Sequence, residues 1–195
     1  MVNTSFARGG YKIHLKIPGV KDSVVYLVHY YGKPLPSIYK RDSARFDKNG
    51  NAEFKSADSS FNGGIYMILL GDRKTYFEFL LNAGDDMTVS AELSKLPEGV
   101  KFKNSPENER FQQYVDFLGT YGKKQQDLQK ELKEAKTHAD SMEVRKKAVA
   151  SSKELTNYRK AYSKDHPNTL LASIFNALST PQVPDGDHFL PDGVT

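Results

Sequence analysis

The chain has 195 residues, a formal net charge of +4, a pI near 9.0 and no cysteine. The lack of cysteine excludes a disulfide, a thiolate nucleophile, a Cys-X-X-Cys redox pair and a cysteine-ligated zinc ion within this sequence. The sequence also has no apolar stretch of about 18 residues, the length that a membrane-spanning helix requires.

Residues 1–9 are predicted to be a leader that precedes the folded region. An alternative interpretation is the remnant of a trimmed signal peptide, because Ser5-Phe6-Ala7 has small residues at the positions that a signal peptidase recognises.

The first half of the folded region shows strand patterns and no helical pattern. Apolar and polar residues alternate from Tyr11 to Ile17, which predicts a strand with one buried face. The Asn49-Gly50 pair predicts a tight hairpin between a third and a fourth strand, since both central residues of such a turn need positive φ. The predicted strands of this part are Tyr11–Ile17, Ser23–Tyr31, Ile38–Phe46 and Ala52–Lys55.

The segment from Gly64 to Leu93 holds the densest run of β-favouring residues. Three apolar runs separated by turn-rich tetrapeptides predict a β-meander. The first two runs are apolar at nearly every position, so we expect them at the centre of a sheet, whereas the third alternates like a half-exposed strand. The runs are Ile65–Leu70, Tyr76–Leu81 and Met87–Ala91, and a last short strand is predicted at Val100–Lys103.

The apolar period changes from two to about 3.6 at Asn104. Ser105 is a suitable N-cap and Pro106 suits the first helical turn. Two heptad seams follow, with a break near residues 137–141, and they predict two helices that fold back as a hairpin. The seams contain Phe111, Tyr114, Leu118, Tyr121, Gln125, Leu128, Leu132 and Ala135, and then Val144, Ala148, Ser151, Leu155, Tyr158 and Tyr162.

A third helix, capped near Asn168 and ending at Pro181, is expected to anchor this hairpin on the sheet. Its apolar residues are Leu170, Leu171, Ile174, Phe175 and Leu178. The sequence therefore predicts an α+β fold, with an antiparallel β-sandwich of about seven to eight strands followed by a helical hairpin and an anchoring helix. The predicted domains are 1–104 for the sandwich and 105–180 for the helices, with 181–195 as a linker or disordered tail.

The order of these segments resembles a known family. The stretches DSARFDKNGNAEFK, GGIYMILL, FEFLLNAGDDMTVSAEL, VKFKNSPENERFQQYVDFL and HPNTLLASIFNALSTPQVP are similar to the N-terminal half of Bacteroidetes-type thioredoxin-like envelope proteins of the AhpC/TSA or TlpA-like kind. The similarity spans about Tyr11 to Pro184. In that family, β-rich and helical domains of unknown function precede a C-terminal thioredoxin fold that carries a Cys-X-X-Cys motif.

The resemblance implies a non-catalytic N-terminal accessory region of a thiol-disulfide oxidoreductase. Its expected partners are the C-terminal thioredoxin-like domain, protein substrates or a second copy of the chain, and its expected location is the periplasm or the outer membrane, with the signal peptide removed. No thioredoxin domain and no cysteine follow Pro184, so we expect a fragment rather than a stand-alone relative. No catalytic, cofactor-binding or metal-binding residue can be carried over from the family.

The ionisable residues give no catalytic or metal-binding pattern. The histidines lie far apart in sequence and lack the spacing of a zinc site. The carboxylates of the tail could bind calcium but lack the Glu and Gly of an EF-hand loop, so a solvated tail is the preferred interpretation. These two sets are His14, His29, His138, His166 and His188, and Asp185, Asp187 and Asp192.

Three carboxylates lie within or beside the predicted meander. Asp85 and Asp86 are adjacent, so on a strand they point to opposite faces and are better explained by turn chemistry than as an acid/base pair. Glu78 interrupts an apolar strand; burial would raise its pKa, although such a residue more often faces solvent at a sheet edge.

Two alternative functions remain open. Tyr26, Tyr30, Tyr31 and Tyr39 could form an aromatic groove for glycans or peptides. The predicted hairpin has twelve Lys or Arg and six Asp or Glu between Lys123 and Lys164, a local charge of +6 that could attract nucleic acid or an anionic membrane. Nucleic acid is disfavoured because the tyrosines of the hairpin fall on its apolar seam and acidic residues interleave with the lysines.

Overall fold

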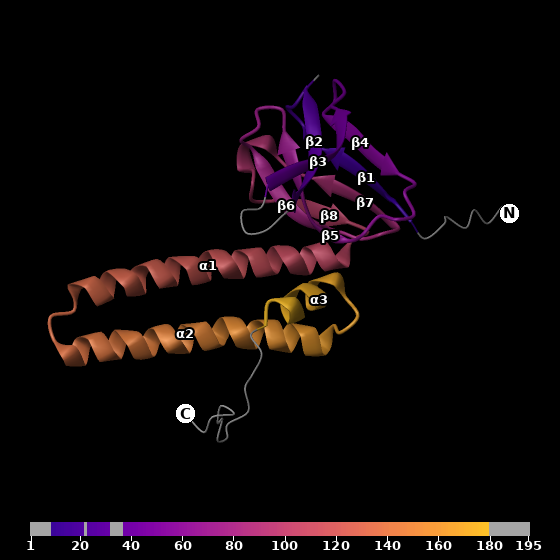
Figure 1. The fold of residues 1–195 in the computed structure, drawn as a ribbon. Helices are drawn as coiled ribbons and strands as arrows, with labels where there is room; N and C mark the ends of the chain where they lie inside the picture. The colour runs from indigo at the N-terminus through magenta and orange to yellow at the C-terminus, as the bar shows by residue number, and fades with distance from the viewer. Residues whose placement is uncertain (1–8, 22, 32–36, 180–195) are drawn as a thin grey trace.

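The computed structural model describes residues 9–21, 23–31 and 37–179 (Figure 1). These residues form eight strands and three α-helices, which confirms the predicted α+β class. Residues 1–8 of the predicted leader (1–9) lie outside the described residues, as do the predicted tail and its Asp185, Asp187, His188 and Asp192.

Two four-stranded sheets pack face to face as a sandwich. All neighbouring strands are antiparallel except β1 and β7, which are parallel, with Ile13 opposite Met87. The first sheet contains, in spatial order, β4 (Asn51–Ser56), β1 (Tyr11–Lys16), β7 (Asp85–Ser90) and β8 (Lys101–Lys103). The second contains β3 (Ser37–Arg45), β2 (Val24–Tyr31), β5 (Gly64–Leu70) and β6 (Tyr76–Leu81).

The predicted hairpin between the third and fourth strands is wrong, because β3 and β4 belong to different sheets. At the turn between them only Gly50 has positive φ, at 77°. The Ile17 N–H donates to the Gly50 carbonyl oxygen at 2.8 Å, and a Cβ at Gly50 would lie 2.3 Å from the Ile17 oxygen. The turn therefore packs on the end of β1 and directs the chain across to the first sheet.

The predicted meander is correct for β5 and β6 and wrong for β7. The turn after β6 includes Gly84 at φ 86°, whose N–H donates to the Gly10 carbonyl oxygen at 2.8 Å. This contact places β7 beside β1 in the other sheet. β6 thus lies at a sheet edge rather than at the centre, and a helix covers the part of its outer face where Leu80 is buried, whereas Tyr76 is exposed and Glu78 is half-buried.

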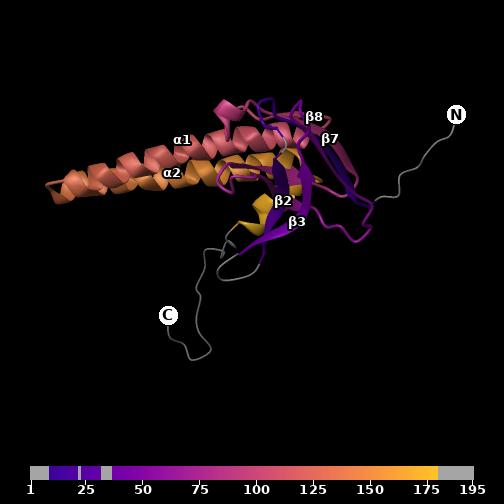
Figure 2. The same ribbon diagram turned by 90° about the horizontal axis from the view of Figure 1, so that it is seen from above.

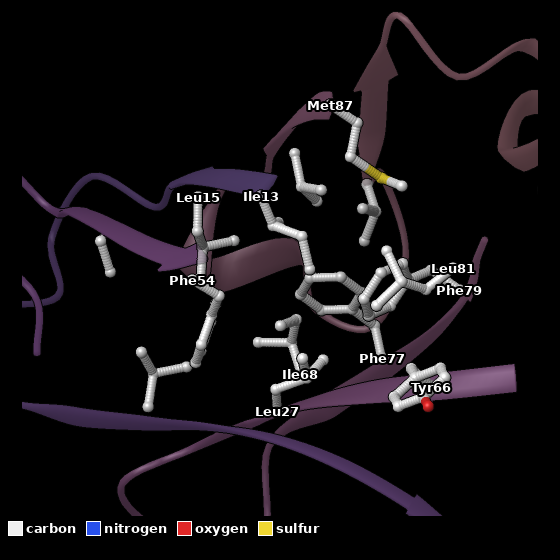
Figure 3. Packing of buried hydrophobic residues seen from close by; sticks show 14 of the residues in the cluster. Ile13, Leu15, Leu27, Phe54, Tyr66, Ile68, Phe77, Phe79, Leu81 and Met87 are labelled. Carbon is white, nitrogen blue, oxygen red and sulfur yellow. The ribbon is translucent and has the colours of Figure 1, made fainter. Parts of the chain in front are cut away.

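The core lies between the two sheets (Figure 3). It consists of alternate residues of each strand, because successive side chains of a strand point to opposite faces. β1 shows this pattern as predicted, with Ile13 and Leu15 buried while Lys12 and Lys16 face outward. The largest fully buried side chains include Phe46, Phe54, Phe79, Leu27, Ile68 and Leu81.

The helical part contains α1 (Pro106–Glu134), α2 (His138–Asp165) and α3 (Leu170–Ala177). α1 and α2 lie antiparallel, side by side, and extend well past the sandwich as a projecting hairpin (Figures 1 and 2). A capping box of Thr137 and Asp140 begins α2, and Thr169, one residue after the predicted cap, begins α3. Ser105 precedes α1 as predicted but makes no side-chain cap bond.

Among the described residues, no helix combines the length and the apolar character needed to cross a membrane.

Candidate functional site

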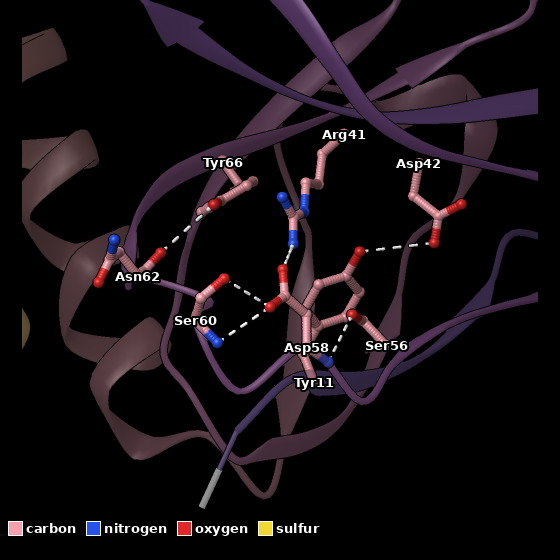
Figure 4. Close-up of polar contacts among 8 residues, drawn as sticks. All are labelled: Tyr11, Arg41, Asp42, Ser56, Asp58, Ser60, Asn62 and Tyr66. Atoms are coloured by element: carbon pink, nitrogen blue, oxygen red, sulfur yellow. Dashed lines mark hydrogen bonds and ion pairs between the residues drawn. The ribbon is translucent and has the colours of Figure 1, made fainter.

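Arg41 lies at an irregularity of the edge strand β3. Leu27 pairs with Asp42 and Val28 pairs with Lys40, so Arg41 is the extra residue of a β-bulge and has no opposite partner on β2. A bulge redirects the side chain of the inserted residue. The guanidinium of Arg41 forms an ion pair with Asp58 (Figure 4). It also lies over the Phe61 ring, 5.6 Å from its centroid.

Asp58 is held in its ionised form. Its carboxylate accepts a hydrogen bond from the Ser60 hydroxyl at 2.6 Å and from the Ser60 N–H at 2.9 Å, in addition to the contact with Arg41. The hydrogen bond from the Ser60 hydroxyl and then that from Arg41 lower the pKa of Asp58 to about 2. Because this group carries no proton near neutral pH and is fully engaged, it positions Arg41 rather than transferring protons.

The two tyrosines beside Arg41 are held in their neutral form. Tyr11 donates to a carboxylate oxygen of Asp42 at 3.4 Å, and burial, followed by the charge of Asp42, raises the pKa of Tyr11 to about 12. Tyr66 donates to the Asn62 carbonyl oxygen at 3.4 Å, and burial also raises its pKa. We define Tyr11, Arg41, Asp58 and Tyr66 as the Arg41 cluster. Its fixed charges and neutral hydroxyls suit binding better than acid/base chemistry.

A row of aromatic rings leads from this cluster to the surface. Neighbouring ring centroids lie between 4.9 and 6.4 Å apart, within the range of favourable aromatic contacts. The exposed end consists of Tyr31 and Tyr39, which are 66% and 54% exposed. In order from the interior, the row contains Tyr11, Phe61, Tyr66, His29, Tyr39 and Tyr31.

The structure brings together only two of the four tyrosines predicted to form a groove. Tyr31 and Tyr39 contact each other with 5.4 Å between centroids. Tyr26 and Tyr30 belong to the opposite face of the same sheet, because alternate residues of β2 share a face. The two-residue spacing of His29 and Tyr31 indicated that their rings lie on the same face of a strand. Nothing local in the sequence marks the bulge at Arg41.

The carboxylates near the predicted meander have separate environments. Glu78 lies half-buried on the edge strand β6, and burial raises its pKa. Asp85 accepts a hydrogen bond from the Asn82 N–H at 2.7 Å, which confirms its role in the turn, and burial raises its pKa. Asp86 is exposed and faces His14 instead. The three carboxylates therefore do not form a common site.

Within the part of the chain that the structure describes, no group of three or more His, Asp or Glu side chains could hold a metal ion. His14 contacts Glu53 at 3.2 Å, His29 belongs to the aromatic row and His166 packs on Tyr162.

Tyr158 and Tyr162 of the hairpin are partly buried in the apolar cluster that the three helices share. Tyr158 stacks on Phe117 with 4.6 Å between centroids, and Tyr162 contacts Phe175 edge to face at 5.3 Å. This confirms that these rings belong to the seam. Further along, Gln125 donates to the Ser151 hydroxyl at 2.8 Å, so the seam is partly polar as predicted.

A joint between the sandwich and the helices lies at the first turn of α1. The buried Asn108 side chain accepts from the Leu80 N–H and donates to the Leu80 carbonyl oxygen, both at 2.7 Å. Glu107 accepts from the Leu171 N–H at 2.7 Å and from the Asn82 amide at 3.3 Å, so it ties the start of α3 to the turn after β6.

Apolar contacts complete this joint. Leu80 is 1% exposed and packs from the outer face of β6 into the helices, with Phe111, Tyr114, Leu171 and Phe175. The third helix thus anchors the hairpin on the sheet as predicted, except that Leu178 is exposed.

Comparison with protein families gives one match. Residues 11–111 match the family described as Domain of unknown function (DUF4369). The chain belongs to this family. No curated protein matches the chain. The matched DUF4369 region begins at the first residue of β1 and ends within the second turn of α1, so it includes both Asn108 and Phe111.

Proposed function

We propose that this DUF4369 protein is a non-catalytic accessory region of a cell-envelope thiol-disulfide oxidoreductase, which positions a thioredoxin-like domain or binds its protein partners. The proposal rests on the resemblance over about Tyr11 to Pro184. The observation that carries it is the joint at Asn108, which fixes a projecting helical hairpin on a β-sandwich.

The joint holds the hairpin in a fixed orientation relative to the sandwich, as a projecting arm. Buried hydrogen bonds between Asn108 and Leu80 and a common apolar cluster both cross it, and each would be lost if the helices moved away from β6. α1 has 29 residues, which corresponds to about 43 Å of helix. Such an arm is suited to holding a second domain, or a partner, at a fixed distance from the sandwich.

The state of the ionisable groups supports a role without catalysis. Asp58 has a pKa of about 2 and Tyr11 a pKa of about 12, so neither exchanges protons near neutral pH. A general acid or base works best with a pKa near the operating pH. Burial raises the pKa of Glu78, and burial followed by the charge of Glu78 raises the pKa of the neighbouring Tyr30, so that tyrosine stays protonated near neutral pH.

Two measurements test this proposal. The purified chain should not accelerate the reduction of a protein disulfide beyond the rate of the reductant alone, and measurable acceleration would refute the non-catalytic role. Sequencing of the reading frame beyond the Thr195 codon should show a thioredoxin fold with Cys-X-X-Cys. A stop codon or an unrelated domain there would refute the link to an oxidoreductase.

The proposed location is the periplasm or the outer membrane. Fractionation of the source cells, with an antibody against the chain, should place it in the envelope fractions. Recovery in the cytosolic fraction alone would contradict this part of the proposal.

A second candidate function is the binding of a glycan or peptide at the exposed end of the aromatic row. The exposed contact between Tyr31 and Tyr39 favours it, because paired aromatic faces give apolar area with fixed geometry. Binding on a glycan array should be lost in Tyr31→Ala/Tyr39→Ala and kept in Tyr76→Ala, a matched control at another exposed ring. Equal loss in both variants, or no binding, would exclude this function.

A further inference from the structure

One face of α2 carries lysines without carboxylates. Lys146, Lys153 and Lys160 recur at intervals of seven residues, about 10.5 Å along the helix, and Lys164 extends the same row by one turn. All four are exposed. We call these four residues the lysine face.

The lysine face points away from α1. The residues that α2 buries against α1 include Val144, Ser151 and Tyr158, and the helical period places the lysine face on the opposite side. The carboxylates of α2 lie on a flank between these two sides, where Glu154 bonds to Lys124 at 2.9 Å and Glu143 lies 3.7 Å from Lys147.

No lysine of this face has a partner among the described residues. The ion pairs of the hairpin involve Lys124 and Lys147, both of which lie near the interface between the helices. On α1, by contrast, basic residues alternate with Asp127, Glu131 and Glu134. The positive potential of the hairpin is therefore concentrated on the outer side of α2.

Apolar side chains accompany the lysines. Met142 and Val149, which are 42% and 56% exposed, precede Lys146 and Lys153 by four residues each and share their side of the helix. Exposed apolar groups beside lysines are the combination with which a helix adsorbs to the surface of an anionic membrane.

Other partners fit this face less well. A coiled-coil partner requires a second apolar row three residues after Met142 and Val149, and those positions hold Arg145 and Ser152. Single-stranded nucleic acid requires exposed aromatic rings for stacking, whereas Tyr158 packs on Phe117 inside the hairpin.

We infer that the lysine face of α2 is a docking surface for an anionic lipid membrane, which holds the hairpin along the bilayer while the sandwich stays in the aqueous phase. The inference is independent of the proposed link to a redox domain. Attraction of a lysine to an anionic bilayer corresponds to about a fivefold gain in partitioning for each residue.

Cosedimentation with vesicles tests the inference. The full chain should bind vesicles of phosphatidylcholine and phosphatidylglycerol in equal parts, and should not bind phosphatidylcholine alone. Raising the salt from 0.1 M to 1 M should release it, because the screening length falls from about 10 Å to about 3 Å.

Two variants that lose the same number of positive charges distinguish the effect of the lysine face on vesicle binding from the effect of net charge. Neutralising the lysine face should lower partitioning at least about 100-fold. Neutralising four lysines of α1 and the loop after it, which are interleaved with carboxylates, should lower it less than about tenfold. The variants are Lys146→Gln/Lys153→Gln/Lys160→Gln/Lys164→Gln and Lys123→Gln/Lys130→Gln/Lys133→Gln/Lys136→Gln. Circular dichroism should show that both are folded, since every substituted residue is exposed.

Equal losses in the two variants would overturn the inference, because net charge and not the face would then govern binding. Failure of the full chain to bind anionic vesicles would overturn it as well. So would tighter binding to a single-stranded oligonucleotide than to vesicles at equal phosphate concentration.

Discussion

Asn108 pairs with Leu80 as a neighbouring strand would pair. Its side-chain amide meets both the N–H and the carbonyl oxygen of Leu80, so a single helical residue satisfies this position on the free edge of β6. An uncovered sheet edge invites pairing with another chain, and covering it with a helix is one way to prevent this. The same contact therefore covers the edge of β6 at Leu80 and attaches the hairpin to the sandwich.

Removal of this amide should destabilise the whole protein. Asn108→Ala leaves the buried N–H and carbonyl of Leu80 without partners, and we expect a loss of about 2 to 4 kcal/mol in the free energy of unfolding. Urea denaturation followed by circular dichroism measures it. Asn157→Ala, at an exposed position of α2, is the control and should cost nothing, since alanine favours helix. Similar values for the two variants would show that the Asn108 contact contributes little.

Adjacent residues of β6 should destabilise different parts of the molecule. Phe79 points into the sandwich core and Leu80 into the helical cluster, so each truncation to alanine should cost about 2 to 5 kcal/mol. Hydrogen exchange distinguishes them: Leu80→Ala should speed exchange first in α3 and the start of α1, and Phe79→Ala first in the sandwich. One common exchange pattern for both variants would mean that the two clusters unfold as a single unit.

The contribution of Asp58 to stability should disappear in acid. Its pKa is about 2 in the folded protein and about 3.9 in an unfolded chain, so the folded state favours the ionised form. The stabilisation is therefore present above pH ~4 and is lost as the pH falls toward ~2. The difference in stability between the wild type and Asp58→Asn should shrink across this window in denaturation curves.

The control for this experiment is Asp127→Asn, at an exposed residue on α1. At neutral pH this substitution should change the free energy of unfolding little, because the Asp127 side chain is exposed. A constant difference between the wild type and Asp58→Asn across pH ~4 to ~2 would show that the Arg41 cluster does not hold the Asp58 carboxylate in its ionised form.

Tyr11 should make the protein sensitive to alkali. Its pKa is about 12 in the folded state, above the value of about 10 for an exposed tyrosine, so the folded state retains the proton more strongly. The resulting stabilisation is present below pH ~10 and is lost as the pH rises through ~12. Tyr11→Phe should remove this part of the alkaline loss, as measured by thermal unfolding between these pH values.

Tyrosinate absorbance gives an independent readout for Tyr11. The late-titrating tyrosines of the wild type, which also include Tyr66, should number one fewer in Tyr11→Phe, and Tyr31→Phe, which alters an exposed ring, is the control. Identical late titration in Tyr11→Phe and the wild type would contradict the assignment.

The sequence by itself determined which stretches are strands, which are helices and which face of each is buried. The alternation in β1 and the change of period at Asn104 are local properties, and the structure agrees with both. The two seams of the hairpin and its partly polar contact at Gln125 were visible for the same reason. For the candidate site, the pattern indicated Tyr31 and Tyr39 but neither Arg41 nor Tyr66.

Only the tertiary structure decided which strands pair. Any strand offers the same backbone N–H and carbonyl groups, so a local pattern fixes the buried face and leaves the neighbour open. For this reason β4 and β7 were expected beside β3 and β6 and are instead both partners of β1. The bulge at Arg41, whose side chain pairs with Asp58, and the pairing of Asn108 with Leu80 likewise depend on where two distant segments meet, which no local pattern predicts.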